Sequence, residues 1–168
     1  MATPALQASS GGEQTNGQYA TFQLADLFFG VNVLKVQEVL CFQHMTRVPR
    51  APAEVEGLIN LRGQMVTAID MRRRLDMPPR PAGDLPLNMV IRTDGGAVSL
   101  LVDEIGDVLD VDLATWERPP ENLDLATRDF ISGIYKLNDR LLLVLDTERT
   151  VDVAPAPRTR GPRTGPQP

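Results

Sequence analysis

The sequence predicts a mainly β protein in which two small five-stranded barrels pack together, with a few short helices. Short segments with a two-residue alternation of apolar side chains predict the strands, and turn residues between them predict hairpins. An internal duplication of the pattern predicts that there are two barrels rather than one.

The strand signal recurs along the chain. Residues 29–33 alternate between apolar and small or polar side chains, which indicates a half-buried strand. Three further pairs of apolar segments are each separated by a short polar turn, as in hairpins. They span residues 57–69, 87–102 and 133–145. The last strand, 141–145, is apolar on both faces and is therefore predicted to be central in its sheet.

Two segments favour short helices instead. Residues 34–40 repeat apolar side chains at helical spacing, which predicts a short turn of helix. Residues 70–75 have the pattern of a helix capped by Asp70. The three arginines of this helix, Arg72–Arg74, are predicted to form a solvent-exposed face that favours solubility.

The hairpin and helix of residues 57–75 align without a gap on residues 133–151, at an offset of 76 residues. Asp70 falls on Asp146, so the helix cap is repeated as well as the turn. The preceding segment repeats more weakly, at an offset of 69 residues that places Val33 on Val102. Each copy is too small to bury a sufficient core alone, so we expect the copies to share an apolar layer.

The folded unit is predicted to span residues 19–153, with subdomains at about 19–75 and 85–151 and exchange of terminal strands allowed. Residues 1–18 are small and polar without an apolar period, which predicts a disordered tail. Residues 154–168 contain five prolines and three arginines, and they are also predicted to be disordered.

Composition excludes several classes of protein. The net charge of −5 and an aromatic content of 5% argue against a nucleic-acid-binding barrel. No apolar stretch approaches the roughly 20 residues of a membrane-spanning helix, and the first residues lack the pattern of a secretory signal. Cys41 is the single cysteine. A cytoplasmic protein without membrane insertion is therefore expected.

No catalytic or cofactor site is predicted. His44 is the sole histidine, so a histidine cluster for a metal is excluded. A nucleophilic pair of Cys41 and His44 is the enzymatic alternative, and it predicts inactivation by thiol alkylation. The acidic stretch 103–112 lacks the spacing and the closing glutamate of a calcium loop. An interaction protein remains as the best interpretation.

The segment Val55–Arg72 resembles the signature of the CheW family, and the resemblance extends over about residues 19–151. The signature matches at Gly57, Asn60, Leu61, Arg62, Gly63, Asp70 and Arg72. Thr67 departs from it, because the family often has proline there. The resemblance implies two packed five-stranded, SH3-like barrels, no active site and no cofactor. It also implies a chemotaxis adaptor that joins methyl-accepting receptors to the regulatory domain of the histidine kinase CheA.

The resemblance further implies that the protein is recruited to membrane-associated receptor arrays, where it contacts the cytoplasmic tip of the receptors. A parallel kinase array, for twitching motility or development, is the alternative. The receptor-binding residues carried over from the family are Val33, Val36, Glu38, Val39, Gly57 and Arg62. For the kinase contact we nominate a separate loop, Met45, Thr46, Arg47 and Val48.

Overall fold

The computed structural model describes residues 17–153. The predicted tails, 1–18 and 154–168, lie outside this range except for Gly17 and Gln18, and Gln18 already begins the first strand. The ten strands are β1 (Gln18–Leu24), β2 (Leu27–Asn32), β3 (Val36–Leu40), β4 (Val55–Leu61), β5 (Gln64–Asp70), β6 (Leu87–Thr93), β7 (Gly96–Val102), β8 (Glu104–Asp110), β9 (Ile131–Lys136) and β10 (Leu141–Leu145). The helical turns are η1 (Val33–Lys35), α1 (Met71–Arg74), η2 (Leu113–Thr115), α2 (Leu125–Arg128) and α3 (Thr147–Val151).

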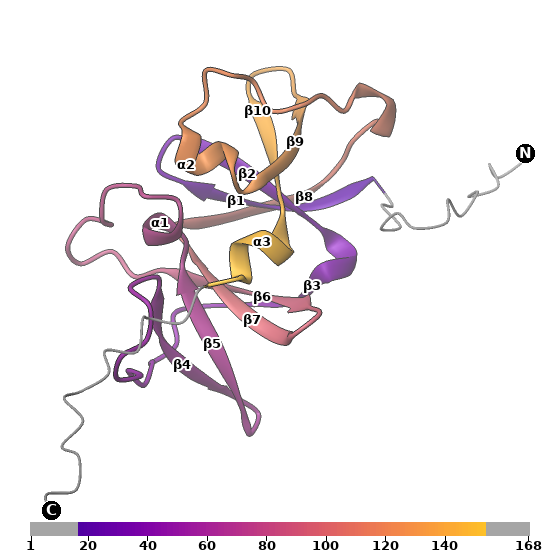
Figure 1. The fold of residues 1–168 in the computed structure, drawn as a ribbon. Coiled ribbons are helices and arrows are strands. Elements are labelled where there is room, and N and C mark those ends of the chain that lie inside the picture. The colour runs from indigo at the N-terminus through magenta and orange to yellow at the C-terminus, as the bar shows by residue number, and fades with distance from the viewer. Residues whose placement is uncertain (1–16, 154–168) are drawn as a thin grey trace, which may run out of the picture.

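The strands form two five-stranded sheets, as predicted (Figure 1). The first sheet has the order β8-β1-β2-β10-β9, and the second has the order β3-β6-β7-β5-β4. Residues 19–75 and 85–151 each supply strands to both sheets, so the exchange that the prediction allowed for involves whole hairpins. The chain therefore crosses between the sheets twice, after β2 and after β7. The second sheet is made from the continuous run β3 to β7, and the first from the strands on either side of that run.

The strand registers reproduce the internal duplication residue by residue. In the second sheet, Thr67 of β5 lies opposite Val98 of the parallel strand β7. In the first sheet, Leu143 of β10 lies opposite Phe29 of β2, which are the same two positions at the offsets of 76 and 69 residues. The antiparallel pairs agree too, with Val36 opposite Ile91 and Ile105 opposite Phe22. The prediction that Met65–Ile69 and Leu141–Leu145 are equivalent strands is confirmed.

Each sheet is closed by the segment that follows its edge strand. After β3, the chain turns back so that Thr46 pairs with Leu58 of β4, with both N–H to O=C distances at 2.8 Å. After β8, Glu117 pairs with Ile134 of β9 at 2.8 and 2.9 Å. These bridges join the two edges of each sheet and use backbone groups that an open edge would leave exposed.

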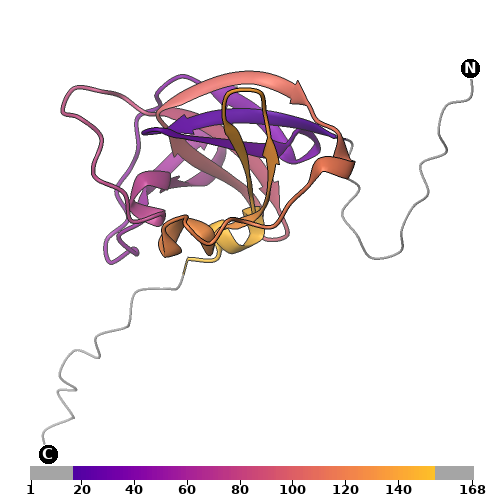
Figure 2. The same cartoon turned by 90° about the horizontal axis from the view of Figure 1, so that it is seen from above.

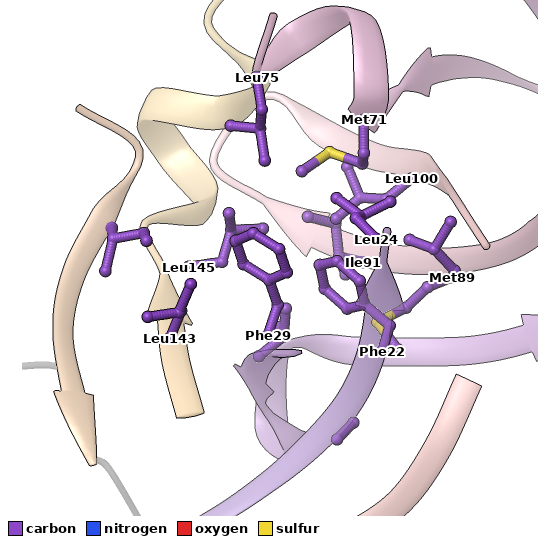
Figure 3. Packing of buried hydrophobic residues seen from close by; sticks show 14 of the residues in the cluster. Phe22, Leu24, Phe29, Met71, Leu75, Met89, Ile91, Leu100, Leu143 and Leu145 are labelled. Carbon is purple, nitrogen blue, oxygen red and sulfur yellow. The ribbon is translucent and has the colours of Figure 1, made fainter. Parts of the chain in front are cut away.

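The largest apolar cluster lies between the two sheets, as the shared layer was predicted to do (Figure 3). Phe22 and Phe29 of the first sheet stack with ring centroids 5.2 Å apart. Met89 and Leu100 of the second sheet pack into the same cluster, and α1 adds Met71. Burial of such side chains contributes about 1.5–3 kcal/mol each. The sheets are therefore held together by the same apolar surface that forms their cores.

The helix predicted at residues 34–40 is wrong. Only Val33–Lys35 form a helical turn, capped by the Asn32 side chain, and the chain then continues as β3. The pairing of β3 with β6 decides this, because a strand at the sheet edge satisfies more backbone groups than a second helical turn would. By contrast, the helix predicted at residues 70–75 forms at Met71–Arg74, and Asp70 caps it through the Arg72 amide at 3.0 Å.

The arginines of α1 do not form an exposed face, so that prediction is also wrong. Arg72 is almost buried against Asp103, with 12% of its side chain exposed. Arg74 donates hydrogen bonds to three carbonyls at the end of α3 and lies over the ring of Phe130. Only Arg73 is half exposed. Three consecutive arginines in the sequence could not reveal that Asp103 covers Arg72 and that the end of α3 covers Arg74.

Candidate functional site

The predicted receptor-binding residues gather at the two edges of the second sheet. Val36, Glu38 and Val39 lie on β3, and Val33 begins the helical turn before it. Arg62 lies at the tip of the β4–β5 hairpin, and its guanidinium contacts the Glu38 carboxylate at 2.9 Å. Residues 24 positions apart are thus joined across the sheet edges. The mutual ion pair that would explain Glu38 and Arg62 without any partner therefore does form.

The hairpin tip holds Arg62 outward. Arg62 adopts a left-handed backbone with φ of 51°, and Gly63 follows with φ of 87°. The Asn60 side chain accepts a hydrogen bond from the Gly63 amide at 2.9 Å and fixes this turn. The Arg62 side chain is 82% exposed, whereas Glu38 beside it is only 17% exposed. The pair therefore orients the arginine while leaving most of its donors accessible.

The valines of the set do not form one surface. Val36 is half-buried and packs against the central apolar cluster. Val39 is 46% exposed, and strand alternation places it on the face opposite Glu38. Leu34 of η1 and Met65 of β5 are also exposed, and the sequence reasoning passed over both. Val36 therefore contributes to the fold as well as to any surface beside η1.

Gly57 has a structural explanation. A Cβ atom at this position would lie 2.6 Å from the carbonyl oxygen of Thr46, in the bridge that closes the second sheet. At the corresponding Gly133, a Cβ atom would clash with the Trp116 ring. Both glycines allow a crossing segment to approach the strand closely. Gly57 is buried and offers no side chain to a partner.

The loop nominated for the kinase contact lies in the connection between β3 and β4. The backbone of Thr46 is used in the closing bridge, and Met45 packs beside a small apolar cluster of the second sheet. Arg47 and Val48 are exposed. Met45 and Arg47 line a groove of about 490 Å³ whose opposite wall is the proline-rich loop between α1 and β6. The structure thus adds a second wall that the sequence did not indicate.

An ionic cluster lies behind that proline-rich loop. Asp103, just after β7, accepts hydrogen bonds from Arg72 Nε at 2.9 Å and from Arg80 Nε at 3.1 Å. Its second oxygen also accepts from the Ala25 amide at 2.8 Å, in the β1–β2 turn of the other sheet. Asp103 therefore connects α1, the proline-rich loop and both sheets. Sequence reasoning missed this ionic cluster, because its residues are far apart along the chain.

The charges of this cluster stabilise one another. Burial alone would raise the pKa of Asp103, but the hydrogen bond from Arg72, the Ala25 amide and the two guanidinium charges outweigh it, so the pKa lies below its usual value. The same hydrogen bond raises the pKa of Arg72, against the effect of burial. Arg80 is less well satisfied, since its buried Nη2 has no hydrogen-bond acceptor and lies 3.9 Å from the nearer Asp70 oxygen.

Between residues 17 and 153, no group of three or more metal-ligating side chains gathers in a way that could hold a metal ion. His44 packs edge-on against Phe42, and Cys41 is exposed. Nor is any helix in this range long and apolar enough to cross a membrane.

Comparison with known proteins supplies the context for these surfaces. A family model described as a CheW-like domain matches residues 18–154. The chemotaxis protein CheW of Bacillus subtilis is 30% identical over 139 residues, covering 83% of this chain and 89% of that protein. CheW of Klebsiella aerogenes is 27% identical over 149 residues, covering 89% and 90%. The crystal structure of the scaffolding protein TtCheW from Thermoanaerobacter tengcongensis matches with a TM-score of 0.73 at 27% identity, covering 82% of this chain and 93% of that chain.

Proposed function

The chain belongs to the CheW family of chemotaxis scaffolding proteins, and on this premise we propose that it couples methyl-accepting chemoreceptors to a CheA-type histidine kinase. CheW scaffolding proteins are non-enzymatic, in agreement with the adaptor predicted from the sequence. In this proposal the protein works on the cytoplasmic side of membrane-associated receptor arrays, with one surface for the receptor tip and another for the regulatory domain of the kinase.

The receptor surface is proposed around Arg62 and Glu38. The observation that carries this proposal is the exposed guanidinium of Arg62, held at a rigid hairpin tip by a carboxylate that is itself largely covered. Such a group can donate charge-assisted hydrogen bonds to a carboxylate or carbonyl of a partner helix. Val33 and Val36 beside η1 add an apolar edge against which that helix can pack.

The kinase surface is proposed at the groove between the β3–β4 connection and the proline-rich loop. Arg47 and Val48 offer exposed side chains there, and Met45 lines the groove. Because Thr46 is committed to the closing bridge through its backbone, we expect its neighbours to make the side-chain contacts. This surface is distinct from the hairpin tip that carries Arg62.

A charge-swap experiment tests the receptor contact. Arg62→Glu removes the donor and is expected to weaken binding of a receptor signalling fragment by about 1–3 kcal/mol, measured by titration calorimetry. The double variant Glu38→Arg with Arg62→Glu restores an ion pair between the two positions. If the pair only stabilises the fold, the double variant will bind normally; if Arg62 contacts the receptor, binding will stay weak.

The first sheet provides a matched control. Lys136 of β9 and Glu117 of the segment that crosses β9 form an exposed ion pair at 3.2 Å beside the corresponding hairpin. Swapping these two charges should leave receptor binding unchanged. Equal losses from both swaps would mean that the assay reports general charge rather than a surface around Arg62.

A further inference from the structure

The loop that forms one wall of the groove makes few backbone hydrogen bonds to the rest of the protein. We define the strap as residues 76–86, between α1 and β6; four of its residues are prolines, which cannot donate backbone hydrogen bonds. Asp76 and Met77 still bond to α1, at 3.2 and 2.7 Å. Within the described chain, the one backbone–backbone hydrogen bond donated by residues 78–86 joins Asp84 to Pro81 and closes a turn inside the strap.

Apolar burial holds only the two ends of the strap. Met77 packs against the central cluster and Pro86 is buried where β6 begins, but residues 81–85 are exposed, Leu85 to 63%. A segment with few buried apolar contacts and few backbone hydrogen bonds to the body is expected to be held by its side chains, or to open locally. The strap in fact carries one well-buried cation, Arg80, of which 12% is exposed.

Two arginines fix the strap to the body through one carboxylate. Arg80 reaches inward and donates from Nε to Asp103 at 3.1 Å. Arg72 donates from Nε to the same Asp103 oxygen at 2.9 Å and uses Nη1 to donate to the carbonyls of Pro78 and Pro79, at 3.0 and 3.3 Å. The strap is therefore anchored at consecutive residues, 78–80, and all three anchors depend on the Arg72–Asp103 pair.

The strap that is anchored in this way is also one wall of the groove. Pro79 through Pro86 line it, opposite Phe42, Met45 and Arg47 of the β3–β4 connection. A displacement of the strap would change the width of this groove and leave the opposite wall unchanged, because the bridge of Thr46 to Leu58 fixes the connection independently.

The second copy of the fold lacks this arrangement. Glu148 of α3 occupies the position of Arg72, and Leu34 occupies the position of Asp103. Glu148 accepts a hydrogen bond from the Asp94 amide, in the β6–β7 turn. The arrangement of arginines around Asp103 therefore belongs to one end of the molecule and is not required by the repeated fold itself.

We propose that Arg80 and Asp103 form a clamp that holds the strap as a preformed wall of the kinase-binding groove, which makes Arg80 a positioning residue for the kinase contact. This inference rests on the proposed kinase surface. A preformed wall reduces the ordering cost of association, so loss of the clamp lowers affinity through the mobility of the whole wall.

The test is Arg80→Gln in the full chain. Asp103 keeps Arg72 and the Ala25 amide as partners in this variant, so the body of the fold is retained. We expect the backbone amides of residues 80 and 82–85 to lose order, with NMR order parameters falling from about 0.85 to below about 0.6. Binding of the kinase regulatory domain should weaken by about tenfold, and binding of the receptor fragment should not change. Arg92→Gln, which removes an exposed cation from β6, is the matched control and should alter neither quantity.

Other outcomes overturn the inference in separable ways. If the strap stays ordered in Arg80→Gln, the clamp does not hold it. Arg47→Glu tests the kinase groove without touching the strap. In a second outcome, Arg80→Gln loosens the strap but leaves kinase binding unchanged, while Arg47→Glu weakens kinase binding. The groove would then bind the kinase without a positioned wall, and the clamp would have no role in binding. If neither variant changes kinase binding, the proposed kinase surface fails as well as the clamp.

Discussion

The hairpin and helix from Gly57 to Leu75 and their copy from Gly133 to Val151 occupy corresponding places in the two sheets. Figure 2 shows the second copy from above, in orange and yellow. Both use a glycine where a crossing segment approaches the strand. Both cap their helix with an aspartate, and in both the arginine three positions later lies within 4.0 Å of that aspartate. These shared residues determine the backbone conformation: the glycines allow a close approach of two segments, and the aspartates cap the helices.

The copies differ at the hairpin tip and at the second residue of the helix. The first hairpin tip presents Arg62 beside Glu38, whereas the second has Asn138 at that position and places Arg140 over the ring of Phe28 at 3.9 Å. The first helix carries the Arg72 that binds Asp103, and the second carries Glu148 there. The comparison separates residues that make the repeated fold from residues that make one end of the molecule distinct. We propose that the second kind carries the partner contacts.

The largest effect on stability is expected at the ionic cluster, which has no counterpart in the second copy. Asp103→Asn leaves Arg72 and Arg80 without their carboxylate in a site where the arginines are each 12% exposed. Breaking such a pair costs on the order of 3 kcal/mol in unfolding free energy. Urea unfolding of the wild type and of Asp103→Asn measures this loss of unfolding free energy. Glu148→Gln, at the corresponding position of α3, should change stability by less than about 0.5 kcal/mol; similar losses in the two variants would erase the distinction between the copies.

The same carboxylate gives the stability a defined dependence on pH. Because the folded protein lowers the pKa of Asp103, its contribution is fully present above the unfolded value of about 3.9 and is lost as the pH falls through the lower folded value. The difference in unfolding free energy between the wild type and Asp103→Asn should therefore be constant above about pH 5 and shrink below about pH 4. A difference that instead grows on acidification would mean that the folded state disfavours the ionised carboxylate.

A smaller effect is expected at the paired glycines. Gly57→Ala would place a Cβ atom against the backbone of Thr46, and overpacking of this kind costs about 1–3 kcal/mol. Gly133→Ala meets the Trp116 ring, which is 45% exposed and can move outward, so its cost should be lower. Thermal unfolding of the two variants compares them directly. A greater loss in Gly133→Ala would show that Trp116 is the more rigid of the two crossing elements.

The smallest effects on stability are expected at the hairpin tips. Arg62→Ala should cost less than about 1 kcal/mol, because the ion pair with Glu38 is exposed on the arginine side. Arg140→Ala removes the contact with Phe28 and should cost about 0.5–1 kcal/mol. Only Arg62→Ala is expected to weaken receptor binding. If Arg62→Ala destabilises the protein by several kcal/mol, its side chain belongs to the fold and the receptor proposal loses its basis.

Much of the fold could be predicted because its signals are local. The hairpin at Arg62-Gly63 and the cap at Asp70 depend on neighbouring residues, and the structure confirms both. The helix predicted at residues 34–40 failed, because Val36–Leu40 pair with β6, about 50 residues further along the chain. Pairing at a sheet edge overrides a weak helical period.

For the proposed site, too, the sequence indicated some residues, and only the structure showed their contacts. Glu38 and Arg62 were named from the sequence, and their direct contact follows from the closing of the second sheet. Val36 was named as a surface residue, but it packs partly against the core between the sheets. Asp103 was named only as part of the acidic stretch 103–112, and Arg80 was not named, since no pattern within the sequence relates an aspartate after β7 to an arginine in a proline-rich loop.

The sequence by itself determined the mainly β class, the approximate positions of seven of the ten strands, the duplication and the family resemblance, because alternation, turns and repeats are properties of neighbouring residues. Only the tertiary structure decided which strands of each half join which sheet, why Gly57 must be small and where the three arginines of α1 point. Each of these depends on segments that meet through the shared core. Residues distant in the sequence decide whether an arginine is exposed to water or paired with a buried carboxylate, so its environment cannot be predicted from its neighbours in the chain.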